Sequence, residues 1–450
     1  MNFRAASVLI AALVVTSCSG GLRTAGEGDG WTRTYEPGVP EFDLEVVPTG
    51  PGAAEARIGL IPGALVHRRT EDGYLRASVR FQLTLDGETI HETEDSLTAS
   101  DPEAARAYRR VLRAIPIEAE PEAVVAVRLE DRATGRTASR QVRLRWVEGD
   151  GARIGQPGLR SGSASRVGLE LRKGYATTEV HAWLESSVPG CLDWTLLAVP
   201  TDTSVARLPF ALSAGYGSLE YRGALYGSAD SLHVRTDTLT AGAREVSLAL
   251  PDGLPLGVHR VELSWRSRCR AVSELVPALT TGRSVLVRPA GFPRVVHLDQ
   301  LIEALTYLAT DGEMDQIRSA PDAVSRKDAY DAFWGRTVGD PALAARTLER
   351  FYGRIEEANR QFSSFKEGWK TDRGMIYVVM GPPLYAEDSV DELRWFYSYD
   401  ERNAGRYFVF ERVRGFPDEL DLPQYSLQRS MEQEREWRLA VQRWRRGAVR

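Results

Sequence analysis

The period of the hydrophobic pattern changes once along this chain of 450 residues, near Pro293. Before that point apolar and polar residues alternate, as in 75–85, and a period of two marks a half-buried strand. After it, apolar residues recur every three or four positions, as at Leu301, Ile302 and Leu305, which is the spacing of one helix face. The pattern therefore predicts all-β domains followed by a domain that contains helices.

Residues 41–147 are predicted to form the first all-β domain. Asp86-Gly87 is a strong hairpin signal after the strand over 75–85, and another hairpin is expected to join 124–129 to 142–146. Between them, Asp101-Pro102-Glu103 favours a short helix, whereas 109–117 is equally consistent with a strand. Short strands at this spacing predict an immunoglobulin-like sandwich.

A second sandwich is predicted over residues 166–290. The segment 148–165 is rich in Gly and Ser and is typical of a linker between domains. Candidate strands of the second sandwich lie at 167–171, 178–183, 194–199 and 257–265. Cys191 and Cys269 both lie in or close to it, and we expect them to form one disulfide in an oxidising compartment. Two separate buried thiols are the alternative.

The first 18 residues have the features of a targeting segment. Arg4 precedes a short apolar run over 5–15, which is too short to span a membrane permanently. Val15-Thr16-Ser17-Cys18 resembles the lipobox of bacterial lipoproteins, and the resemblance implies cleavage before Cys18 and its lipidation, including a palmitate-type acyl chain. Ser19 in place of Asp favours the outer membrane, and 19–40 is predicted to be a flexible tether. An ordinary secretory signal with an unrelated cysteine is the alternative.

The third domain is predicted to join a long helix to a small sheet. Asp340-Pro341 provides an N-cap and a Pro at the first helical position, and Gly368 is expected to end the helix. A buried strand over 375–380 is then predicted, followed by the turn Gly381-Pro382-Pro383. Two further strands, 393–399 and 406–410, complete a small antiparallel meander packed on helices.

Residues 293–450 resemble the GWxTD-domain family of bacterial envelope proteins. The resemblance rests on a spaced set of residues: Asn359, Phe362, Gly368, Trp369, Thr371, Asp372, Arg373, Gly374, Ile376, Tyr377, Gly381 and Pro382. Leu384 departs from the family, which more often has Asp there. The resemblance implies an envelope protein and carries no assigned biochemical activity. The first interpretation of Trp369, Thr371 and Asp372 is structural: the indole packs as a plug and the two polar residues form a hydrogen-bonded turn. The alternative is that they belong to a binding or catalytic site. Asp372 and Arg373 are candidates for a local ion pair.

Several classes of chemistry lack the residues they need in this sequence. The six histidines are scattered, no His/Cys cluster has metal-ligand spacing, and the sequence has neither a phosphate-binding loop nor a nucleophile elbow. We therefore expect no cofactor and no metal, and the net charge of -5 gives no drive toward nucleic acid. Carboxylates could still support hydrolysis of a glycan if two of them face a cleft. The candidates are Asp372, Asp388, Asp391, Glu392 and Asp400.

The sequence thus favours an outer-membrane lipoprotein that acts as a non-catalytic binding or assembly module. Its expected partners are the outer-membrane lipid, through acylated Cys18, and an envelope protein. The alternatives are a carboxylate-based hydrolase of envelope glycans and a scaffold in a surface secretion or motility machine. An exposed apolar patch near Tyr397 or Trp444 would favour the binding module. The helix expected over 430–446 either docks through Trp437 and Trp444 or touches a membrane with its arginines.

Overall fold

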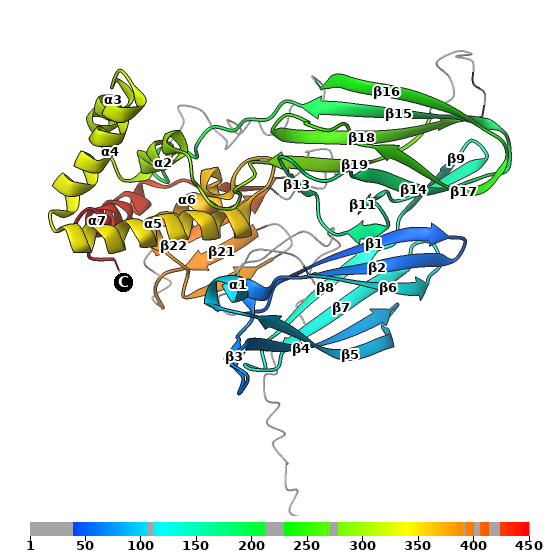
Figure 1. The fold of residues 1–450 in the computed structure, drawn as a ribbon, viewed down its shortest axis with the longest axis horizontal. Helices are drawn as coiled ribbons and strands as arrows, with labels where there is room; N and C mark the ends of the chain where they lie inside the picture. Colours follow the sequence, from blue (N-terminus) through cyan, green and yellow to red (C-terminus); the bar gives the residue numbers. More distant parts are fainter. Residues whose placement is uncertain are drawn as a thin grey trace, which may run out of the picture.

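A computed structural model of the chain describes residues 39–106, 111–211, 229–267, 269, 278–389, 392–399, 406–413 and 424–449. Two β-sandwiches come first, and a domain of helices and a four-stranded sheet follows (Figure 1). The predicted sandwiches and α+β domain are therefore confirmed. The targeting segment, Cys18 and the tether as far as residue 38 lie outside the described residues.

The first sandwich packs a three-stranded sheet against a five-stranded sheet. One sheet contains β1 (Phe42–Gly50), β2 (Ala53–Leu60) and β6 (Val111–Glu118); the other contains β3 (Arg68–Arg69), β4 (Leu75–Leu85), β5 (Glu88–Ala99), β7 (Val124–Asp131) and β8 (Thr137–Arg143). The expected turn joins β4 to β5, where Asp86 and Gly87 both have positive φ, 49° and 89°. The short helix and the strand that were considered between the two hairpins are both present. Helix α1 (Pro102–Arg106) comes first, and strand β6 follows it.

The second sandwich packs a six-stranded sheet against a five-stranded sheet. The first contains β9 (Trp146–Gly149), β10 (Ala152–Gly155), β11 (Gly158–Ser161), β12 (Ala164–Arg166), β14 (Glu179–Ser186) and β17 (Gly242–Ala249); the second contains β13 (Glu170–Arg172), β15 (Gly190–Val199), β16 (Asp230–Leu239), β18 (Gly257–Arg266) and β19 (Leu279–Arg288). Cys191 and Cys269 are joined by a disulfide.

The predicted linker over 148–165 is wrong, because this segment forms strands of the second sandwich. Gly and Ser are here the residues of tight connections between very short strands, and Gly151 and Gly162 have positive φ, 71° and 58°. Side chains of these strands, such as Ile154 and Leu159, are fully buried in the second core. Composition alone does not distinguish a flexible linker from a run of two-residue turns.

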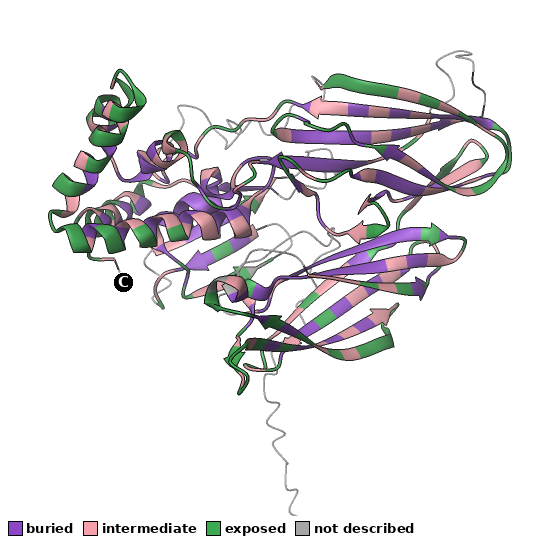
Figure 2. Cartoon of the chain, viewed as in Figure 1, coloured by how far each residue is buried: buried purple, intermediate pink, exposed green. Residues whose placement is uncertain are grey.

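Buried charges join the two sandwiches. Strand β1 is buried along nearly its whole length, because one of its faces meets its own core and the other meets the second sandwich (Figure 2). Across this interface Arg283 forms an ion pair with Glu45, and Nη2 of Arg57 lies 3.1 Å from Nε2 of His181. Burial, reinforced by the charge of Arg57, lowers the pKa of His181 to about 3.

The third domain packs helices against one face of a four-stranded antiparallel sheet. The helices are α2 (Leu298–Ala304), α3 (Asp311–Arg318), α4 (Ala323–Val338), α5 (Pro341–Phe362), α6 (Asp372–Met380) and α7 (Glu434–Arg445); the strands are β20 (Tyr385–Asp388), β21 (Glu392–Phe396), β22 (Tyr407–Arg412) and β23 (Tyr425–Leu427). The Asp340 side chain caps α5 as expected, accepting a hydrogen bond from the Leu343 N–H at 2.7 Å. However, α5 ends at Phe362 and not at Gly368.

The predicted strand over 375–380 is also wrong, because these residues belong to helix α6. Thr371 caps this helix, its Oγ1 accepting a hydrogen bond from the Gly374 N–H at 3.1 Å. Every residue of α6 except Met380 is buried. A helix buried on all sides has no polar face, so its apolar run shows neither the strand period nor the helix period. Gly381, with φ of 90°, ends α6.

A segment from the second sandwich anchors the third domain. Ala206 is buried in the core of the third domain, and its N–H donates to the Lys370 carbonyl at 3.0 Å. Nearby, Lys366 Nζ donates to the Ser204 carbonyl at 2.8 Å. Among the residues that the structure describes, we find no helix with the length and apolar character needed to cross a bilayer.

Candidate functional site

The GWxTD motif lies where α5, the 3-10 turn Gly368–Lys370 and α6 meet. A Cβ atom on Gly368 would lie 1.9 Å from the Ala358 carbonyl oxygen of α5. A Cβ atom on Gly374 would lie 1.9 Å from the Gly368 carbonyl oxygen. Both positions therefore need glycine for close approach between backbones.

Trp369 fills the centre of this junction and is fully buried. Its backbone N–H donates to Asn359 Oδ1 at 3.3 Å, and its carbonyl accepts from the Tyr307 hydroxyl at 2.9 Å. The Tyr307 ring meets the indole edge-on, with ring centroids 5.9 Å apart. Asn359 also donates to the Pro293 carbonyl at 2.9 Å. The motif thereby fixes α5 against the beginning of the domain.

Asp372 forms its ion pair with Arg429 rather than with its neighbour Arg373. Arg429 Nη2 donates to Asp372 Oδ1 at 2.6 Å, and the Leu427 N–H donates to Oδ2 at 2.8 Å. The Arg373 guanidinium instead lies over the Tyr425 ring, 4.2 Å from its centroid. Both charges of the motif therefore attach β23 and the segment after it to α6.

Side chains around the motif are committed to structure. Burial lowers the pKa of Lys366 to about 8, while the pKa of Lys370 is raised because its interactions with Glu367 and Glu303 outweigh the effect of burial. Eleven of the twelve residues that carry the family resemblance are buried: Asn359, Phe362, Gly368, Trp369, Thr371, Asp372, Arg373, Gly374, Ile376, Tyr377 and Gly381. Pro382 alone of this set is exposed. The motif residues therefore hold elements of the domain together in its interior, in agreement with the interpretation of the motif as a packed plug.

The candidate carboxylates do not form a pair around a cleft within the described residues. Asp372 is only 1 % exposed and neutralised by Arg429, and Glu392 pairs with Arg394 on the surface of β21. Asp388 ends β20, and Asp391 and Asp400 lie outside the described residues. The described part of the chain also contains no group of three His, Cys, Asp or Glu side chains arranged to hold a metal ion.

Trp444 contributes to no exposed apolar patch, whereas exposed apolar side chains do lie near Tyr397: Tyr399 is 82 % exposed and Leu384 is 53 % exposed. Trp444 is fully buried, and its indole N–H donates to the Val379 carbonyl of α6 at 3.0 Å. The Tyr397 hydroxyl donates to the Gly381 carbonyl at 2.7 Å. Helix α7 therefore docks on the domain through its tryptophans, and Arg445 adds an ion pair to Glu313 at 2.8 Å.

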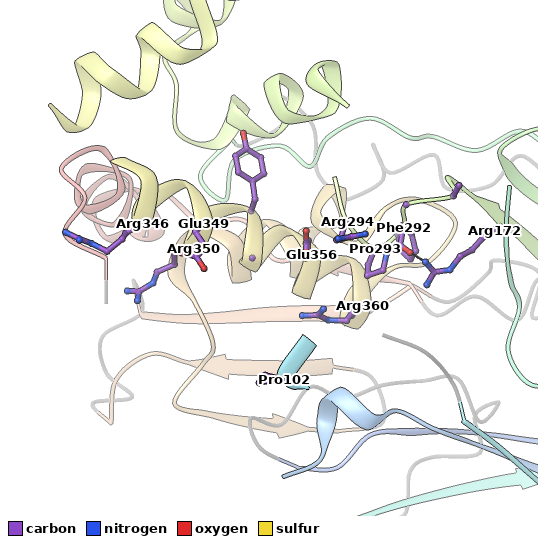
Figure 3. Close-up of a pocket in the computed structure, with 14 residues that line it drawn as sticks. Pro102, Arg172, Phe292, Pro293, Arg294, Arg346, Glu349, Arg350, Glu356 and Arg360 are labelled. Atoms are coloured by element: carbon purple, nitrogen blue, oxygen red, sulfur yellow. Dashed lines mark hydrogen bonds between the residues drawn. The ribbon is translucent and has the colours of Figure 1, made fainter. Parts of the chain in front are cut away.

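A groove rich in arginine lies on the outer side of α5 (Figure 3). It encloses about 1220 Å³ between α5, the segment 290–294, Arg172 of the second sandwich and Pro102 of the first. All three domains thus contribute to it. Five arginines and two glutamates line it: Arg172, Arg294, Arg346, Arg350, Arg360, Glu349 and Glu356. We call it the α5 groove.

Not all charges of the α5 groove are used within the protein. Arg350 donates to the Val449 carbonyl at 2.5 Å, and Arg360 pairs with Glu357. Arg346, in contrast, makes no hydrogen bond or ion pair with any described residue. Burial raises the pKa of Glu356, and this effect outweighs the opposing charges of Arg360 and Arg294.

The α5 groove was not predicted from the sequence. Arg346 and Arg350 are four residues apart on a helix that was predicted, so their shared face was an available signal. Arg172 and Arg294 come from distant parts of the chain, and only the packing of the domains brings them together. The motif is the most distinctive stretch of sequence, but its residues lie in the interior and do not line the groove.

Comparison with known proteins gives a family match in the C-terminal region. Residues 276–446 match the family described as the GWxTD domain. No curated protein matches the sequence. Among solved structures, red sea bream transglutaminase is 9% identical over 56% of this chain and 32% of its own, with a TM-score of 0.17. Escherichia coli alpha-2-macroglobulin activated by porcine elastase is 10% identical over 56% of this chain and 23% of its own, with a TM-score of 0.16. The chain thus spans less than a third of the length of either structure.

Proposed function

We propose, on the premise that residues 276–446 are a GWxTD domain, that this chain is an outer-membrane lipoprotein that binds an envelope component without transforming it. The α5 groove is the contact surface, and the two sandwiches hold it at a fixed place relative to the membrane anchor. The proposal rests above all on one observation: the motif is buried, whereas an arginine-lined groove is open where the three domains meet.

The membrane attachment is supported by sequence alone. Residues 15–18 resemble a lipobox, and a cysteine at this place is the acceptor for a diacylglycerol group. Several acyl chains on one residue give stable anchoring, whereas a single chain gives only reversible binding. Cells labelled with radioactive palmitate should label the wild-type chain and not the Cys18→Ser variant, and the label should fractionate with the outer membrane. Label that persists in the variant would contradict this attachment.

Binding through the α5 groove is tested by capture from crosslinked envelopes. The test variant combines Arg294→Ala and Arg346→Ala, because neither side chain makes a hydrogen bond or ion pair with a described residue. The control combines Arg336→Ala and Arg435→Ala, which removes equal charge from exposed helix positions outside the α5 groove. Circular dichroism establishes that both variants remain folded.

The proposal expects an envelope component that copurifies in comparable amount with the wild type and the control and is depleted in the test variant. Equal capture by the test variant would overturn the assignment of the groove. The same experiment addresses a scaffold in a surface secretion or motility machine, which would be identified by the proteins captured. A scaffold and a simple binding module differ in their partners and not in the geometry of the contact.

A second function, hydrolysis of an envelope glycan, is favoured by the carboxyl groups of the α5 groove. Glu356 has a raised pKa, as a general acid needs, and Glu349 lies two helical turns away in the same groove. Release of reducing sugar ends from isolated envelopes by the wild type, and its loss in Glu356→Gln, would favour this function. Absence of such release with the wild type would exclude it for those envelopes.

A further inference from the structure

We infer that the α5 groove binds an acidic glycan, a chain of sugars that carries both anionic groups and hydroxyl groups. This inference rests on the proposed function and names the class of its ligand.

The excess of positive charge selects an anion. A guanidinium presents two parallel N–H donors that match the two oxygens of a carboxylate or phosphate, so an arginine-lined groove is specific for such groups. Arg346 has no partner within the described residues, and Arg294 interacts with Glu356 only at longer range. The charges that remain for a ligand therefore lie at two separate places along the groove (Figure 3).

The length of the charged face indicates an extended ligand. Arg346 and Arg360 are fourteen positions apart on one continuous helix, which corresponds to about 21 Å at 1.5 Å per residue. The enclosed volume of about 1220 Å³ is also larger than that of most sites for small molecules. A single sugar or phosphate would occupy only a fraction of this space.

The order of charges separates a glycan from a uniform polyanion. Along α5 the lining residues alternate in sign: Arg346, Glu349, Arg350, Glu356, Arg360. A polyanion without hydroxyl groups, such as polyglutamate, would present only like charge to the two glutamates, which is unfavourable. Carboxylates accept hydrogen bonds from hydroxyl groups, and a glycan supplies these between its anionic groups. The groove is thus complementary to alternating acidic and hydroxyl-bearing positions.

Small residues leave room for such a chain on α5. Gly353 lies between the charged residues 346–350 and 356–360 of α5. A Cβ atom built at Gly353 meets nothing within 4 Å. On the opposite wall Gly291 likewise adds no side chain. A ribbon of sugar rings therefore has access to the helix surface between the charges.

The test measures binding of defined probes to the full acylated chain in a non-ionic detergent. The probes are an oligogalacturonate, a neutral oligosaccharide of equal length and a polyglutamate peptide of equal charge. We expect the oligogalacturonate to bind at least ten times more tightly than either other probe, and less tightly as salt rises. We also expect Arg294→Ala combined with Arg346→Ala to weaken this binding at least tenfold, while Arg336→Ala combined with Arg435→Ala leaves it unchanged.

Three results would overturn the inference: no binding of the oligogalacturonate, equal binding of the polyglutamate, or equal binding by the groove variant. If capture from envelopes still depends on the groove, only the glycan assignment fails. If neither the capture from envelopes nor the binding of the oligogalacturonate depends on Arg294 and Arg346, the proposed function and the glycan assignment both fail.

Discussion

Asp372 and Arg429 form an ion pair with 2.6 Å between Oδ1 and Nη2, and the Asp372 side chain is only 1 % exposed. The acid of the GWxTD motif is thus bound inside the protein to a residue that follows β23. Removing one partner of a buried pair leaves the other charge without compensation, which costs far more than the pair contributes as a whole. Substitution of Asp372 therefore tests the stability of the domain and not a contact with a ligand.

Asp372→Ala is expected to lower the free energy of unfolding of the C-terminal domain by about 3 kcal/mol, because Arg429 and the Leu427 N–H both lose their acceptor. Urea denaturation followed by tryptophan fluorescence measures the effect. Asp315→Ala on α3 is the control, since this exposed side chain makes no hydrogen bond or ion pair with a described residue, and it should change stability by less than about 0.5 kcal/mol. Equal effects of the two substitutions would refute the structural role.

Gly374→Ala is expected to prevent normal folding, because the new Cβ would lie 1.9 Å from the Gly368 carbonyl oxygen. Gly335→Ala in α4 is the matched control: it is also a helical glycine, and nothing lies within 4 Å of the added atom. The control should be as stable as the wild type or about 0.5–1 kcal/mol more stable. Soluble yield and thermal midpoints compare the two variants, and a well-folded Gly374→Ala protein would show that the junction is looser than described.

The interface between the sandwiches is expected to weaken in acid because of His181. Its pKa is about 3 when folded and near the ordinary 6.5 when unfolded, so between these values the unfolded chain binds a proton that the folded chain does not. Stability should therefore fall as the pH drops from 6.5 toward 3, by at most about 1.4 kcal/mol per pH unit from this group. Glu245 Oε2, 3.5 Å from Nδ1, favours the charged form, but burial and the nearby arginines outweigh it.

His181→Gln should flatten this pH dependence, whereas His91→Gln, at an exposed position on β5, should leave it as in the wild type. Denaturation midpoints at pH 5 and pH 7 provide the comparison. Identical pH slopes for wild type and His181→Gln would show that other groups control the acid response.

The disulfide between Cys191 and Cys269 is expected to stabilise the second sandwich. It closes a loop of 78 residues, for which the loss of chain entropy in the unfolded state corresponds to about 4.5 kcal/mol. Denatured protein from the oxidising compartment should show neither thiol in a titration unless it is first reduced. Two reactive thiols before reduction would contradict the pairing.

The sequence was sufficient for the fold wherever one face of an element meets solvent. The alternation over 75–85 and the helical spacing after Asp340 both predicted elements that the structure contains. It was insufficient for α6, which is buried on all sides, and for the strands of 148–165, whose turn residues resemble a linker. The motif was recognised and interpreted as a packed plug, but the partner of Asp372 follows β23, which lies 53 residues further along and could not be placed from the sequence.

A photoreactive side chain inside the α5 groove would capture whatever binds there in the living cell. A benzophenone amino acid at Gly353 would enter the groove, and the same residue at Gly335 would project from α4 outside it; both glycines have open space around them. We expect irradiation of intact cells to yield an adduct with an envelope component from position 353 and none from position 335. No adduct from position 353, or equal adducts from both, would contradict the claim that this groove is the contact surface.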